Sequence, residues 1–458
     1  MNKKYLIGLP AFLLILSFVY SDEKSKTSSE LPNSENWSID IGKTSFRTNA
    51  SLTSSYIVIG SNGDNYRDAY ITDDRNGVHI INRKTGKRVR NFAKESIGDL
   101  DVNGTLIYQN RIYFGNDNDE FICADFNGNI KYSLPVSGDV ESEAVLIKVH
   151  GKDVLVFGTE AGEVRAINPK NGETIWQHFH KDFKGWKMGD NRLVFKVKTH
   201  FSMTYLFLMK PIVKDLNSDG IGDIVYSMNG QFYSINGANG KILHAFDWTE
   251  DYDQWSDPNV LHNAFYNAET ILFTKDKDGK TLVTVPKYSY RPIEGSNRTD
   301  GYKIHMLTFD LKGNIIEKKR VVEKAKENDF RRLPNTRIFC SGHNIFQFDN
   351  NMKLISNTTI EKFLEVRGDY FAYFISDQLI DINQQKCMVM LLEHKGIIAF
   401  VNINSGKIVR KIKLKGRSEF IPHIEDINKD GQMDLLFADD SNQLTCMTLG
   451  KGIHVLNK

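Results

Sequence analysis

A short pattern of apolar and polar residues returns along the whole chain. An alternating strand is followed by a polar turn with Asn or Asp and usually Gly, and then by a second alternating strand. The first strand of each copy covers residues 78–82, 121–125, 164–168, 232–236, 304–308, 345–349, 397–402 and 444–448. A period of two predicts a β-strand, and Asx/Gly residues between two such runs predict a tight turn. The pattern therefore predicts repeated β-hairpins.

Each hairpin is preceded by another β-like run, such as Ile112-Tyr-Phe114. This gives about four strands per unit of roughly 40–45 residues, which is the size of a propeller blade. Trp37–Ile41 is also β-like, and the last unit stops at Leu456, short of a full blade. In propellers the N-terminal strand often completes the last blade and removes an exposed edge. We therefore predict an all-β propeller over residues 37–458 with eight blades, seven being the alternative, closed by the N-terminal strand.

Two stretches are longer than the repeat, and we expect insertions at 179–210 and 249–303. Long loops on a rigid scaffold often carry function, and aromatics with charged neighbours suit protein or glycan surfaces. The candidate partner-binding residues are Trp186, Trp255, Tyr288 and Tyr290. The alternative is that these aromatics pack the loops onto the propeller. The charged stretch Glu317–Asp329 is predicted as one helical turn or a loop.

One acidic motif occurs twice, at 215–223 (DLNSDGIGD) and at 426–434 (DINKDGQMD). Both copies place oxygen-bearing side chains at positions 1, 3, 5 and 9, a glycine at 6 and a backbone carbonyl at 7. Short loops wrap a hard cation in this way. The predicted ligands are Asp215, Asn217, Asp219, Ile221 (carbonyl) and Asp223, and Asp426, Asn428, Asp430, Gln432 (carbonyl) and Asp434. The motif therefore predicts two structural Ca²⁺ ions.

The flanks of this motif exclude an EF-hand. An EF-hand needs a bidentate Glu at position 12, where the two copies in this chain have Tyr226 and Phe437. Apolar β-like runs flank both copies, so we expect a calcium loop between strands. The alternative is a polar Asx/Gly turn without metal.

The repeat also resembles a known family. The signature of a strand and then Asn/Asp-x-x-Thr/Asn-Gly-Lys-x-Ile/Val, with Trp at 176 and 248, resembles the quinoprotein-like (PQQ-like) β-propeller repeat. The acidic loops resemble the FG-GAP/VCBS repeat of integrin-type and bacterial propellers. The resemblance spans about residues 37–458 and implies the fold, but such propellers host many activities.

The cysteines argue against a quinone cofactor. Quinoprotein dehydrogenases have a vicinal cysteine disulfide, whereas Cys123, Cys340, Cys387 and Cys446 stand far apart. PQQ is therefore not expected. The spacing also fits no zinc or thioredoxin-like motif, and buried free thiols are expected instead.

The first residues have the pattern of an export signal. Lys3-Lys4 precede an apolar run from Tyr5 to Tyr20, and Val19-x-Ser21 offers small residues for cleavage. We predict a signal peptide over 1–21 and a polar, Ser-rich flexible leader over 22–36. The alternative is an uncleaved anchor, which would bring contact with a membrane, although the run is short for a span. The expected location is secreted or periplasmic.

The net charge and the absence of known catalytic motifs narrow the possible functions further. The formal net charge of +2 predicts no nucleic-acid or acidic-lipid partner, and neither G-x-S-x-G nor H-E-x-x-H occurs. The sequence favours an exported, calcium-stabilised scaffold that binds a protein or polysaccharide in the envelope or extracellular space. The alternative is a degenerate quinoprotein or a carboxylate-based enzyme at the propeller funnel, acting as an oxidoreductase, lyase or hydrolase.

Overall fold

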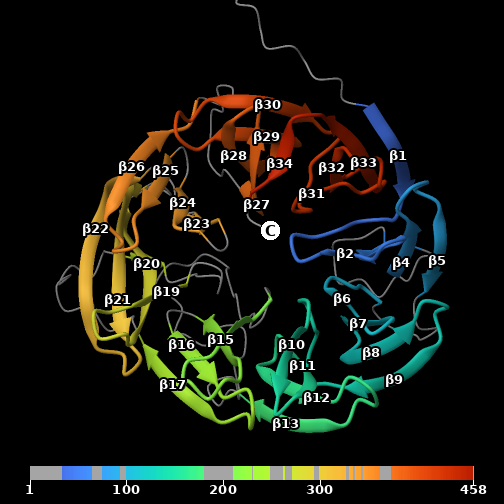
Figure 1. The fold of residues 1–458 in the computed structure, drawn as a ribbon, viewed down its shortest axis with the longest axis horizontal. Helices are drawn as coiled ribbons and strands as arrows, with labels where there is room; N and C mark the ends of the chain where they lie inside the picture. Colours follow the sequence, from blue (N-terminus) through green and yellow to red (C-terminus); the bar gives the residue numbers. More distant parts are fainter. Residues whose placement is uncertain are drawn as a thin grey trace, which may run out of the picture. The chain divides into compact units, whose positions relative to one another are not determined.

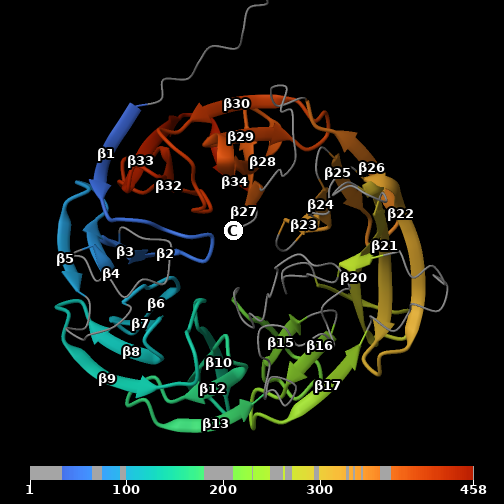
Figure 2. The same ribbon diagram turned by 180° about the vertical axis from the view of Figure 1, so that it is seen from behind.

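Eight antiparallel sheets stand around a ring in the computed structural model (Figures 1 and 2). All described elements belong to the unit Asn33–Lys458. The structure describes residues 34–63, 75–92, 100–179, 210–228, 231–247, 261–263, 271–292, 299–325, 330–333, 336–341, 344–361 and 373–456.

The first four blades each have four strands, which follow one another along the chain from the inner to the outer edge of the sheet. Blade 1 has β2 (Ala50–Leu52), β3 (Tyr56–Asn62), β4 (Asn76–Asn82) and β5 (Arg88–Phe92). Blade 2 has β6 (Thr105–Tyr108), β7 (Arg111–Asn116), β8 (Glu120–Asp125) and β9 (Ile130–Pro135). Blade 3 has β10 (Val145–Val149), β11 (Lys152–Gly158), β12 (Glu163–Ile167) and β13 (Thr174–Phe179). Blade 4 has β14 (Ile212–Lys214), β15 (Asp223–Met228), β16 (Gln231–Ile235) and β17 (Ile242–Asp247).

The next three blades vary more at their inner edges. In blade 5, β18 (Leu261–Asn263) and β19 (Leu272–Lys275) both pair with β20 (Thr281–Pro292), followed by β21 (Thr299–Asp310) and β22 (Ile315–Ala325). Blade 6 has β23 (Phe330–Arg332), β24 (Ile338–Ser341), β25 (Asn344–Phe348) and β26 (Leu354–Thr359). Blade 7 has β27 (Tyr373–Ile382), β28 (Gln385–Leu392), β29 (Ile397–Asn402) and β30 (Ile408–Lys413), and β34 (Ile453–Val455) pairs with its inner strand β27.

Blade 8 closes the ring with strands from both ends of the unit. It has β31 (His423–Glu425), β32 (Met433–Ala438) and β33 (Gln443–Gly450), and β1 (Ser34–Asp40) is its outer strand. Trp37 lies opposite Cys446, and Asp40 lies opposite Gln443. The predicted eight-bladed propeller closed by the N-terminal strand is therefore confirmed.

Local turn chemistry explains why the hairpins form where the pattern places them. In blade 1 the Asn82 side chain accepts hydrogen bonds from the backbone N–H groups of Lys84 (3.1 Å) and Thr85 (3.0 Å). Gly86 follows with a φ of 66°, a left-handed conformation that glycine adopts at little cost. Blade 7 repeats this turn at Asn402 and Gly406.

At several junctions an aromatic ring lies against the turn glycine of the next blade, whereas Gly406 of blade 7 lies against the backbone of Thr359 and Ile360. Trp176 of blade 3 donates from Nε1 to the carbonyl of Gly237 in blade 4 at 2.9 Å. Trp37 of blade 8 donates in the same way to the carbonyl of Arg83 in blade 1 at 3.0 Å. A Cβ on Gly86 would lie 2.5 Å from the Trp37 ring, so the glycine makes this contact possible. Trp248, the second tryptophan of the predicted signature, lies outside the described residues.

The apolar core is divided among the interfaces between blades. One buried cluster joins Val156 and Ala166 of blade 3 to Ile224 of blade 4. Another joins Leu436 of blade 8 to Ile57 of blade 1. Within the described ranges, the 3₁₀ helix Glu393–Lys395 is the helical element, and no helix there is long and apolar enough to cross a membrane.

Two sequence predictions are changed by the structure. The described part of the charged stretch, Glu317–Ala325, is neither a helical turn nor a loop, because Ile315–Ala325 forms the outer strand β22. An outer strand has one neighbour and faces solvent, so charged side chains fit it well. The described part of 249–303 also contains β18, β19, β20 and the start of β21, so this part of the predicted insertion belongs to blade 5 itself.

Candidate functional site

The first acidic loop connects β14 to β15 at the inner side of blade 4. Asp215 accepts hydrogen bonds from the backbone N–H groups of Ser218 (2.7 Å) and Gly220 (3.0 Å). Ser218 and Gly220 have φ angles of 63° and 80°, so the chain bends sharply around this carboxylate. The glycine at position 6 thus takes the bend that the sequence predicts.

The next two oxygen-bearing side chains of this loop are exposed and contact each other. Asn217 donates from Nδ2 to Asp219 at 2.9 Å, and its Oδ1 accepts from the Asp219 N–H at 3.0 Å. Asp219 also accepts from the N–H of Ile221 at 2.8 Å. The hydrogen bonds from the Ile221 backbone and the Asn217 side chain lower the pKa of Asp219, so this carboxylate stays ionised.

The carboxylate at position 9 anchors the loop from inside the blade. Asp223 is fully buried, and it accepts hydrogen bonds from the N–H groups of Leu216 (2.8 Å) and Gly237 (3.2 Å). Burial raises its pKa, and the nearby charges of Asp219 and Asp215 add to this effect.

The second acidic loop, between β31 and β32, has the same construction. Asp426 accepts from the N–H groups of Asp430 (3.0 Å) and Gly431 (3.1 Å). Asn428 and Asp430 repeat the contact between positions 3 and 5, at 3.0 Å. The matching geometry shows that both loops are ordered by their own backbone amides.

The second loop is also held by the strand that closes the ring. Buried Asp434 accepts from the N–H groups of Ile427 (2.9 Å) and Asn428 (3.1 Å). Its other oxygen accepts from the Thr448 hydroxyl and from Nδ2 of Asn36 in β1, each at 2.9 Å. Burial raises the pKa of Asp434. This loop therefore contacts the first strand of the propeller, far away in sequence.

The fit of these loops to a cation is partial. Asp215, Asn217 and Asp219 offer oxygen atoms at or near the surface, which is the chemistry that Ca²⁺ takes, whereas Asp223 is buried and already accepts two amides. Across the described ranges, no group of three or more His, Cys, Asp or Glu side chains is arranged to hold a metal ion. The loops thus present ligands of the right type without a closed cage.

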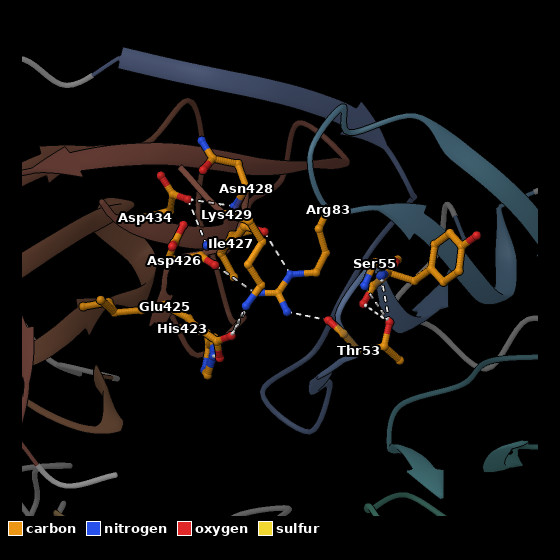
Figure 3. A network of polar contacts seen from close by, with 12 residues as sticks. Thr53, Ser55, Arg83, His423, Glu425, Asp426, Ile427, Asn428, Lys429 and Asp434 are labelled. Atoms are coloured by element: carbon orange, nitrogen blue, oxygen red, sulfur yellow. Dashed lines mark hydrogen bonds and ion pairs between the residues drawn. The ribbon is translucent and has the colours of Figure 1, made fainter. Parts of the chain in front are cut away.

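A buried arginine connects the second loop to blade 1 (Figure 3). Arg83 lies in the β4–β5 turn, and its side chain is 4% exposed. It donates to the carbonyls of Ile427 and Asp426 at 2.9 Å each, to the carbonyl of Thr53, and to the Glu425 carboxylate at 2.8 Å. The guanidinium group thereby fastens the first blade to the last.

This contact is specific to the junction where the ring closes. The residue that follows the turn-capping position in each successive blade is Arg83, Phe126, Pro169, Gly237, Leu311, Asn350, Ile403 and Leu449. A charged residue stands there in blade 1 alone. A hydrogen bond from His423, and then the neighbouring Arg83, lower the pKa of Glu425 to about 2, so the Glu425 carboxylate is ionised at neutral pH.

The predicted partner-binding aromatics are not brought together by the described structure. Trp186 and Trp255 lie outside the described residues. Tyr288 and Tyr290 lie on β20, where Tyr288 pairs with Ile304 and Tyr290 with Tyr302 of β21. These two tyrosines therefore belong to a strand of blade 5 and not to a free loop.

The four cysteines are confirmed as buried free thiols. Burial raises the pKa of Cys387 to about 12, so this thiol stays protonated and unreactive at neutral pH.

Comparison with known proteins agrees with the fold. Residues 37–192 match the family model described as "Outer membrane protein assembly factor BamB". The repeats are of the PQQ-like propeller type. The crystal structure of BamB from Moraxella catarrhalis is similar, with a TM-score of 0.51 and 11% identity over 92% of this chain and 99% of that chain. Saccharomyces cerevisiae Sqt1 has a TM-score of 0.53 and 11% identity over 92% and 100% of the two chains. No curated protein matches the chain in sequence.

At such low identity the two solved structures show the fold alone. Sequence reasoning missed Arg83 and Asn36, whose side chains hold the second acidic loop in place. The one local signal was the charge of Arg83 at a position that is uncharged in the other blades.

Proposed function

We propose that this chain is an exported scaffold that binds protein partners in the cell envelope. The match of residues 37–192 to the family model of an outer-membrane assembly factor carries this proposal. Closed propellers are rigid and present many loops, which suits a protein that gathers others. The apolar N-terminal run supports export, and N-terminal sequencing of the exported protein should begin near Asp22.

Calcium is a second part of the proposal. Each acidic loop would take one structural Ca²⁺ through the side chains at positions 1, 3 and 5 and the carbonyl at position 7. In the first loop these groups are Asp215, Asn217, Asp219 and the Ile221 carbonyl, and Asp223 anchors the base of the loop through the Leu216 and Gly237 amides. The ion would stabilise the loop and supply no chemistry.

The scaffold proposal is tested by capture of partners in the cell. The chain is cross-linked in its source organism, purified from the envelope fraction, and its captured proteins are identified. Alanine at Trp186, Trp255, Tyr288 and Tyr290 together tests whether these aromatics form the contact surface. The expected result is a defined set of envelope proteins that the folded quadruple variant loses.

A matched control is alanine at two exposed outer-strand residues, Ile175 and Ile355, which are 45% and 67% exposed. Capture should survive these changes. Recovery of the chain from the cytoplasm, or capture of no envelope protein, would overturn the scaffold proposal. If the folded quadruple variant captures the same proteins as the wild type, the contact surface lies elsewhere on the chain.

A further inference from the structure

Blade 7 has a strand that the propeller repeat does not explain. Blade 5 also has five described strands, but there β18 and β19 are two pieces paired with the same strand, β20. The fifth strand of blade 7, β34, comes instead from beyond blade 8 and pairs with the inner strand β27 (Figure 1). It therefore lies on an edge that the inner strands of other blades leave without a further strand in the described structure.

The chain reaches this edge because the outer position of blade 8, where a fourth strand would follow, is already occupied. In the other blades the third strand turns outward into a fourth strand, but β1 already fills that place in blade 8. Gly450 and Gly452, with φ angles of 96° and 79°, turn the chain inward instead. A Cβ on Gly452 would lie 2.7 Å from the Asn383 side chain, so the turn is built for close approach.

The segment lies on the edge as an extended peptide would. Val455 lies opposite Ile380, His454 opposite Asp381, and Ile453 opposite Ile382. Two backbone hydrogen bonds bracket the pairing, from Asn383 N to Gly452 O (3.2 Å) and from Leu456 N to Leu379 O (2.7 Å). The contact is thus main-chain pairing over a few residues.

Side chains alternate along the segment between the core and solvent. Ile453 is 3% exposed, and Val455 packs against the same apolar cluster of blades 7 and 8. His454 and Leu456 are exposed. The edge therefore accepts two β-branched residues two positions apart, and Asp381 stands opposite the residue between them.

We propose that the inner edge of blade 7, Leu379–Asn383, is a docking edge for an extended protein segment, and that residues 451–456 occupy it as an internal ligand. The partner is a strand with β-branched residues at alternate positions and a basic or histidine residue between them. In such strand addition the main-chain hydrogen bonds supply affinity and the alternate side chains supply specificity. This inference rests on the proposed scaffold function and adds a second contact site to it, with the class of partner strand that this site would take.

A short strand holds such an edge because it is tethered. A three-residue pairing has little stability of its own, but a short connection gives it an effective concentration in the millimolar range. A partner strand that makes more hydrogen bonds, or is itself tethered in a complex, displaces it. The internal segment thus prevents binding by any partner strand whose affinity for the edge is too low to displace it.

The test uses a labelled peptide of residues 451–456 and the full chain. Ile453→Asp with Val455→Asp detaches the internal strand, because both side chains must enter an apolar cluster. Lys451→Ser is the matched control, since this exposed side chain lies outside the paired residues. Fluorescence anisotropy should show the peptide binding the detached variant at least tenfold more tightly than the wild type or the control. A peptide with both aspartate changes should not bind.

A detached variant that keeps the wild-type circular dichroism spectrum but binds the peptide no better than the wild type would overturn the proposal. If that variant does not fold, the unmodified protein is mixed with millimolar peptide carrying a photo-cross-linker in place of Leu456. Cross-links to β27 support the edge, and cross-links elsewhere or none refute it. Peptide binding without any captured envelope protein would refute the scaffold function and leave the edge intact.

Discussion

Replacement of Arg83 by methionine should weaken the junction where the ring closes. Methionine keeps much of the aliphatic length but removes the guanidinium group. Three backbone carbonyls, of Thr53, Asp426 and Ile427, then lose a charged donor. Hydrogen bonds to charged groups contribute about 1.5–3 kcal/mol each, and a buried acceptor left unpaired costs about 1–3 kcal/mol.

The net loss is smaller than the sum of these terms. The variant no longer buries a charge, which recovers part of the desolvation cost. Glu425 is 29% exposed, so water reaches its carboxylate when the arginine is gone. We therefore expect a loss of about 2–4 kcal/mol in the free energy of unfolding. With an unfolding entropy of about 2.1 cal/mol/K per residue, the melting temperature of a unit of this size falls by roughly 2–4 °C.

Hydrogen exchange locates the effect, because local opening exposes particular amides. Amides of β1 and β2 should exchange faster in the variant, while those of blades 3 and 4 should not change. Lys87→Met, an exposed change on the same hairpin, should alter stability by no more than about 0.5 kcal/mol. Equal melting temperatures for the two variants, with unchanged exchange in β1, would show that Arg83 does not hold the ring closed.

Acid stability, turn packing and calcium binding can be tested in the same way. The pKa of Glu425 in the fold is about 2, below its ordinary value of 4.5. The ionised carboxylate therefore stabilises the fold above pH 4.5, and this stabilisation is lost as the pH falls toward 2. The melting temperature of Glu425→Gln should fall less steeply with pH over this range. Gly86→Ala should cost about 1–3 kcal/mol in thermal unfolding, because the new Cβ meets Trp37 and φ is positive; a neutral result would contradict this packing. Calcium at a hundredfold excess over its dissociation constant should stabilise by about 2.7 kcal/mol per site, and Asp219→Ala and Asp430→Ala should each remove one site in calorimetry; no heat from the wild type would mean empty turns.

The hairpins could be predicted from the sequence because their causes are local. The alternation of a strand, the turn-capping Asn82 or Asn402, and the turn glycines all act over a few neighbouring residues. Counting such units gave the blades, and the unfinished last unit pointed to closure by the N-terminal strand. The two acidic loops could also be placed between strands, since their apolar flanks are continuous with the repeat.

The tertiary structure decided which distant residues meet. Nothing local pairs Arg83 with Ile427, which is 344 residues away, because that contact depends on closing the whole ring. Outer strands such as Ile315–Ala325 resist prediction because one face is solvated and charges hide the alternation. The inward turn of Ile453–Val455 also depends on distant residues, because β1 occupies the outer place in blade 8 and β34 pairs with β27 instead. Such pairings depend on which segments lie next to each other in the closed ring, and no local pattern of residues encodes that.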